Sequence, residues 1–101
     1  MAAFEEHVRW ALDALPPELA RGLENVAVVV EEANAHDPGL LGLFEVAPYM
    51  PAKVTIYRRP LEADFGHDPE LLEHEIRVTV LHELAHYFGI DEDRLADLGY
   101  A

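Results

Sequence analysis

The sequence predicts a single small α+β domain over residues 1–101, with an N-terminal helix, a sheet of three to four short strands, a long helix and a short C-terminal helix. Three observations lead to this fold class. The chain has 101 residues, a size at which one chain forms one modest core. Half of the residues are hydrophobic, which favours a folded chain over a disordered one. Apolar residues follow the helical period in some segments and form β-branched or alternating runs in others.

The N-terminal segment, residues 3–15, predicts an amphipathic helix because its apolar side chains recur at the helical period. The two prolines at 16–17 end that helix and can start a short turn. A valine-rich run follows at 26–30. Because this run is apolar on both faces, it indicates a central strand whose two faces are covered.

Two further strands are expected before the long helix. Residues 31–38 are acidic and rich in turn formers, so they predict a loop. Residues 40–46 predict a second strand, which Gly42 interrupts. Residues 53–58 alternate between polar and apolar side chains, which predicts a strand with one face on the core. A helical turn is expected at 61–65.

A long helix is predicted from Pro69 to about Phe88. Asp68 suits the N-cap position and Pro69 the first helical position. Gly89 then allows the helix to stop, and Asp91 can cap a last short helix. The first half of the long helix is polar on one side and its second half is apolar nearly all round. We therefore expect its second half to enter the core.

This second half contains the motif His82-Glu83-Leu84-Ala85-His86. His82 and His86 are four residues apart, so they share one face of the helix, with Cβ atoms roughly 5–6 Å apart. Two imidazoles at this spacing can both reach one zinc ion at about 2.0–2.1 Å, and Glu83 flanks them as a candidate base. Polar side chains in an apolar segment are costly to bury alone, and a divalent cation offsets that cost by binding them. The residues indicate a zinc hydrolase site.

The chain is strongly acidic, with 20 acidic against 7 basic residues and a formal charge of −13. This charge disfavours nucleic acid and anionic membranes as partners and attracts cationic ones, although solubility alone also explains it. Cysteine is absent, so a metal must be bound by histidine and carboxylate. Neither a signal-peptide pattern nor an apolar run of transmembrane length is visible. We expect a cytoplasmic monomer.

The segment from His82 to Glu92 resembles the extended zinc signature of metzincin-type peptidases, HExxHxxGxx followed by histidine or aspartate. In its length, order of elements and motif near the C-terminus, the whole chain resembles the small bacterial zincin-like metallopeptidase family. The resemblance implies an α/β domain with the active-site helix against a mixed sheet, a peptide or protein substrate, and Zn2+ as cofactor. It also implies His82 and His86 as zinc ligands and Glu83 as the catalytic base.

The third ligand departs from the signature. The signature places it at position 92, which is Glu92 in this chain. Glutamate is a competent oxygen ligand, but its extra methylene changes its reach, so Asp91 or Asp93 can substitute for it. Metzincins also carry a methionine below the metal, downstream of the signature. The methionines of this chain, Met1 and Met50, both lie upstream, so the floor of the site is expected to differ.

The strand at 53–58 is expected to lie beside the cleft and to align an extended peptide by main-chain pairing. Tyr57 is a candidate oxyanion donor and Arg58 a candidate substrate anchor, but packing and salt bridging are the favoured interpretations of these two residues. Two alternatives to a peptidase stay open. One is a metal-binding domain without catalysis, and the other is an acidic interaction module in which the motif is a coincidence on a solvated helix face.

Overall fold

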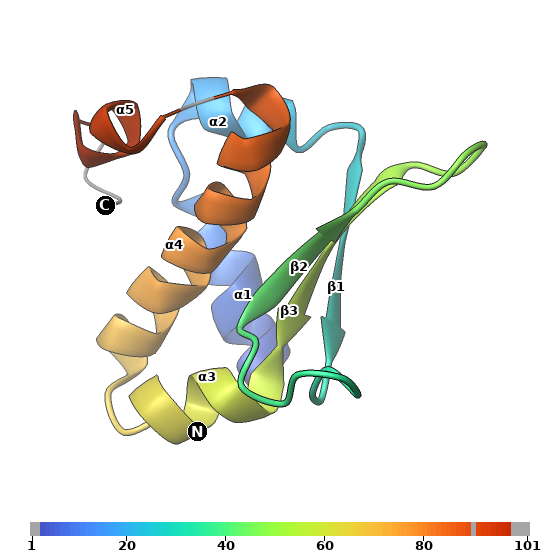
Figure 1. Ribbon diagram of the computed structural model, residues 1–101. Coiled ribbons are helices and arrows are strands. Elements are labelled where there is room, and N and C mark those ends of the chain that lie inside the picture. Colours follow the sequence, from blue (N-terminus) through green and yellow to red (C-terminus); the bar gives the residue numbers. More distant parts are fainter. Residues whose placement is uncertain (1–2, 90, 98–101) are drawn as a thin grey trace.

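The computed structural model describes residues 3–89 and 91–97, without the side chains of Glu18, His86, Tyr87, Phe88, Glu92 and Leu95. Within these ranges the predicted small α+β domain is confirmed. Its elements in chain order are α1 (Phe4–Asp13), α2 (Pro17–Gly22), β1 (Val26–Glu31), β2 (Gly42–Glu45), β3 (Ala52–Tyr57), α3 (Arg58–Phe65), α4 (Pro69–Phe88) and α5 (Glu92–Asp97) (Figure 1).

The three strands form one mixed sheet in the order β1-β3-β2. β3 pairs in parallel with β1 and antiparallel with β2, where Gly42 lies opposite Ile56. β3 is therefore the central strand, and the side chains of its last four residues, 54–57, are all buried.

Two expectations about the strands are wrong. The valine-rich run forms β1, an edge strand of the described sheet rather than a central one, and its Ala27 is exposed. The alternating run 53–58 was expected to bury one face, yet Val54 and Thr55, which point to opposite faces, are both fully buried. An apolar pattern indicates which faces can be covered, but it does not specify which strands pair along each edge. Arg58 begins α3 and does not belong to the strand.

The helices α1 and α4 pack together, and α4 packs on β2 and β3 (Figure 1). The prediction of a long helix packed on the sheet is thus confirmed. The main core lies between these layers and consists of Phe4, Val8, Ala11, Val54, Ile56, Leu61, Leu72, Ile76, Val80 and Leu84. A second cluster joins the region of α2 to the last turns of α4 and consists of Leu15, Leu19, Leu81 and Ala85.

The helix α4 begins and ends where its caps predict. Asp68 Oδ1 accepts hydrogen bonds from two backbone N–H groups of the first turn (3.1 and 3.3 Å), and Pro69 occupies the first turn. Gly89 adopts the left-handed conformation with φ of 68°, and its N–H donates to the carbonyl of Ala85. Both ends of α4 are therefore fixed by local chemistry.

Gly42 is buried where β2 approaches α4. A Cβ atom at this position would lie 2.5 Å from Thr79 Cγ2 and 3.3 Å from the carbonyl oxygen of Thr55. The first distance is a severe overlap, so the approach of the strand to the helix requires the absence of a side chain. The glycine that interrupts the second strand in the sequence is therefore a packing requirement.

We predict that Gly42→Ala lowers the free energy of unfolding by about 1–3 kcal/mol, because overpacking separates β2 from α4. Thr79→Ser removes the overlapping methyl but keeps the hydroxyl that donates to the Glu75 carbonyl (2.8 Å). The double variant should therefore recover part of the loss, as a double-mutant cycle in urea denaturation will show. Gly39→Ala is the matched control, since its added Cβ would meet only an ordinary contact at 3.8 Å. Wild-type stability of Gly42→Ala would contradict the packing argument.

Candidate active site

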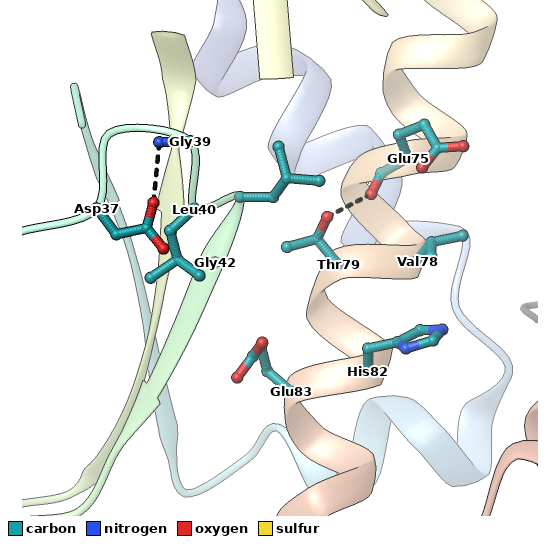
Figure 2. A pocket seen from close by; sticks show the side chains of 10 residues that line it. Asp37, Gly39, Leu40, Gly42, Glu75, Val78, Thr79, His82 and Glu83 are labelled. Carbon is teal, nitrogen blue, oxygen red and sulfur yellow. Dashed lines mark hydrogen bonds between the residues drawn. The ribbon is translucent and has the colours of Figure 1, made fainter. Parts of the chain in front are cut away.

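The helix α4 carries the predicted motif in its C-terminal half. His82 is half-buried, and its Nε2 atom is shielded from solvent. His86 follows one turn later in the same uninterrupted helix and on the same face, although its side chain lies outside the described residues. Glu83 is turned about 100° from His82 around the helix axis. Figure 2 shows Glu83 projecting toward β2 and His82 projecting away from that strand.

The Glu83 carboxylate is held at the edge of the sheet. Its Oε2 accepts a hydrogen bond from the backbone N–H of Phe44 in β2 (3.1 Å). Tyr57 donates its N–H to the carbonyl of Leu41 (3.0 Å), and directly bonded pairs alternate along an antiparallel ladder. The main-chain groups of Gly42 and Phe44 therefore face away from β3. Glu83 thus binds an outward-facing N–H of the edge strand.

A cavity of about 500 Å³ lies between α4 and the loop that precedes β2. Its lining comes from both sides and includes Asp37, Leu40, Gly42, Thr79, His82 and Glu83 (Figure 2). Two residues of the predicted site therefore form one end of the cavity. A ligand in this cavity lies next to Glu83 and to the edge of β2.

Asn34 fixes the loop wall of the cavity. Its Oδ1 accepts hydrogen bonds from the N–H groups of His36 and Asp37 (2.9 Å each), and its Nδ2 donates to the Tyr57 hydroxyl (2.9 Å). Asp37 Oδ1 accepts from the N–H of Gly39 (3.3 Å). The sequence predicted this segment as a loop, and it assigned neither Asn34 nor Asp37 to the site. The one local signal is the asparagine itself, which commonly bonds backbone groups just after it.

Tyr57 and Arg58 have structural roles, as packing and salt bridging predicted. The Tyr57 side chain is 3 % exposed and its hydroxyl is engaged by Asn34. Arg58 pairs with Glu32 and with Glu62 (2.9 Å), and the hydrogen bonds that it donates to these carboxylates, the one to Glu32 first, raise the pKa of its guanidinium. The alternatives, an oxyanion donor and a substrate anchor, have no support, because neither residue is among the described residues that line the cavity.

The expectation that residues 53–58 align a substrate is wrong. β3 is the central strand, and its main-chain groups on both edges pair with neighbouring strands. A further strand needs an unpaired edge. The edge strand next to the motif is β2, whose Phe44 N–H already contacts Glu83.

The candidates for the third ligand follow α4. Glu92 is the first residue of α5, and its side chain lies outside the described residues. Asp91 accepts a hydrogen bond from the N–H of Arg94 (2.9 Å), so it caps α5 as predicted, and Asp93 is exposed. Among the side chains that the structure describes, no group of three or more potential ligands is placed to hold a metal. That set excludes the side chains of His86 and Glu92.

The donor atoms of the motif fit zinc by their chemistry. Imidazole nitrogen and carboxylate oxygen are zinc ligands in proteins, and catalytic zinc sites use three of them. His82 offers a ring nitrogen from a position that is shielded from solvent, at one end of the cavity. His86 starts from the same face of the helix. These two histidines can therefore supply two of the ligands of a zinc site.

Comparison with known families identifies the class of protein. A model of the zincin-like metallopeptidase family matches residues 23–100, a span that runs from just before β1 through the motif and α5. The chain therefore belongs to the zincin-like metallopeptidase family. A search of curated proteins found no match. Membership supports a metallopeptidase and implies zinc as the usual cofactor. No helix in the described part of the chain is long and apolar enough to cross a membrane.

We predict that Asn34→Ala loosens the loop wall of the cavity and lowers the free energy of unfolding by about 1–2 kcal/mol, because three hydrogen bonds are lost. Amide hydrogen exchange at His36 and Asp37 should become faster. Asn34→Asp keeps the acceptor for both amides, so these two amides should stay protected in that matched variant. Unchanged exchange at both positions in Asn34→Ala would show that the loop is held by other contacts.

Proposed function

We propose that this chain is a zinc-dependent peptidase in which His82, His86 and Glu92 hold the metal and Glu83 is the general base. One observation carries the proposal most directly. The Glu83 carboxylate is bound to the edge of β2 and lines the same cavity as His82. A candidate base, a predicted metal ligand and a strand edge therefore meet at one cavity, an arrangement that suits metal-assisted peptide hydrolysis.

When bound, the zinc ion supplies Lewis-acid chemistry, activating water and polarising the scissile carbonyl. Glu83 accepts a proton from the attacking water at a carboxylate oxygen and passes it to the nitrogen of the leaving amine as the C–N bond breaks. The hydrogen bond from Phe44 to Oε2 orients the carboxylate for both transfers. His82 and His86 bind through ring nitrogens and take no part in proton transfer.

The edge of β2 is the proposed docking strand for the substrate. The main-chain groups of Gly42 face away from β3, so an extended peptide can pair with this edge beside the motif. Since the Phe44 N–H contacts Glu83, the same edge orients the base and aligns the substrate. Short or unfolded peptides are the proposed substrates, because only an extended segment can pair with the edge of a strand.

We predict that Glu83→Gln retains one zinc ion per chain but lowers kcat/KM by about 10²–10⁴-fold, because the amide cannot accept the proton. The glutamine oxygen can still accept the Phe44 N–H, so the geometry should persist. His82→Ala should lose both zinc and activity. Metal analysis together with cleavage of a fluorogenic peptide mixture measures both effects. Glu70→Gln, at an exposed position of the same helix, is the control and should change neither.

Each alternative predicts a different result in the same measurements. Hydrolysis by Glu83→Gln at the wild-type rate would remove the base assignment. Stoichiometric zinc in a wild-type protein that cleaves no peptide would favour a metal-binding domain without catalysis. Absence of stoichiometric zinc would favour the acidic interaction module.

A further inference from the structure

We propose that the cavity beside Glu83 binds a cationic side chain, lysine or arginine, of the peptide substrate. This inference rests on the proposed peptidase function and names the class of substrate that the same site selects. It is carried by the charge of the cavity, by the shape of its walls and by the fixed position of one carboxylate.

The acidic groups of the cavity come from both of its sides. Asp37 lies on the loop side, and Glu75 and Glu83 come from α4 (Figure 2). Neither lysine nor arginine occurs among the described residues that line the cavity. The formal charge of the chain is −13, which the two positive charges of a bound zinc ion reduce only slightly, so the field around the cavity attracts cations and repels anions.

The walls of the cavity are partly apolar. Leu40 and Leu41 on the loop side and Val78 on the helix side contribute to the lining. Lysine and arginine place an aliphatic stem along apolar surface and a charged group at its polar end. A volume of about 500 Å³ accommodates one such side chain together with water. A glutamate or aspartate side chain would meet like charge in the same place.

Asp37 is the carboxylate best placed to receive the cation. Its backbone N–H is bound by Asn34 (2.9 Å) and its Oδ1 by the N–H of Gly39 (3.3 Å), so its position is set before a ligand arrives. Preorganisation of this kind reduces the entropy lost on binding. Glu83 is held at β2 by the Phe44 N–H and is the proposed general base rather than the partner of the cation. Glu75 adds negative charge from the helix side.

The first test is cleavage of a peptide series by the zinc-loaded protein. The peptides share one scaffold and carry lysine, arginine, norleucine or glutamate at one position, which is moved step by step through the residues on both sides of the scissile bond. Norleucine keeps the stem of lysine without its charge. At one position, kcat/KM should be about tenfold higher for lysine or arginine than for norleucine, and lowest for glutamate. This preference should shrink as sodium chloride is raised.

Asp37→Asn should remove most of this preference, because the negative charge is lost while the asparagine oxygen can still accept the Gly39 N–H. Glu75→Gln should reduce the preference to a smaller extent. Asp64→Asn and Glu70→Gln are matched controls, because they remove the same charges at exposed positions outside the cavity lining. An equal loss in these controls would assign the preference to net charge and overturn the subsite.

A binding measurement separates this inference from the peptidase proposal. N-acetylarginine amide and N-acetylnorleucine amide are titrated against the zinc-loaded protein while the NMR signals of the Val78 and Thr79 methyl groups are followed. If only the arginine probe shifts these signals, and the shifts are lost in Asp37→Asn, the subsite is supported even if no peptide is cleaved. The absence of cleavage would then overturn only the proposed peptidase function. Peptide cleavage without a preference for lysine or arginine, and without shifts specific to arginine, would overturn the subsite and leave the peptidase intact.

Discussion

The close contact between α4 and β2 is the constraint on which the candidate site depends. At Gly42 the strand approaches the helix so closely that a Cβ atom would overlap Thr79. Two residues further along the strand, the Phe44 N–H reaches the Glu83 carboxylate. An edge strand has outward-facing N–H groups that need acceptors, and a part-buried carboxylate needs donors. The Phe44 N–H and the Glu83 carboxylate therefore satisfy each other, and this hydrogen bond holds Glu83 at the end of the cavity.

The helix α4 contributes residues to both the hydrophobic core and the candidate site. Ile76 and Val80 are fully buried in the main cluster, whereas His82 and Glu83 face the cavity. Because successive residues are turned by about 100° around the helix axis, any rotation that repacks the core also moves the motif. Stability and site geometry are therefore coupled in this small domain, and the caps at both helix ends contribute to each.

The loop between β1 and β2 supplies the part of the site that the helix lacks. Asn34 connects this loop to the hydroxyl of Tyr57, which is buried in the central strand. The loop can therefore present Asp37 from a fixed position although it has no regular secondary structure. Loops held by a rigid scaffold commonly carry binding residues, and in this family member such a loop contributes Asp37 to the lining of the cavity.

The sequence by itself determined the features that depend on near neighbours. Asp68, Pro69 and Gly89 fixed the limits of α4, and the four-residue spacing of His82 and His86 put them on one helical face, because caps and helical periodicity act within one or two turns. Only the tertiary structure decided that β3 is central, that β2 is the edge beside the motif and that the loop after β1 completes a cavity. Those features depend on partners far apart in the chain, such as Phe44 and Glu83, which are 39 residues apart. No local pattern encodes such a pairing, since it results from how the strands and the helix pack around one shared core.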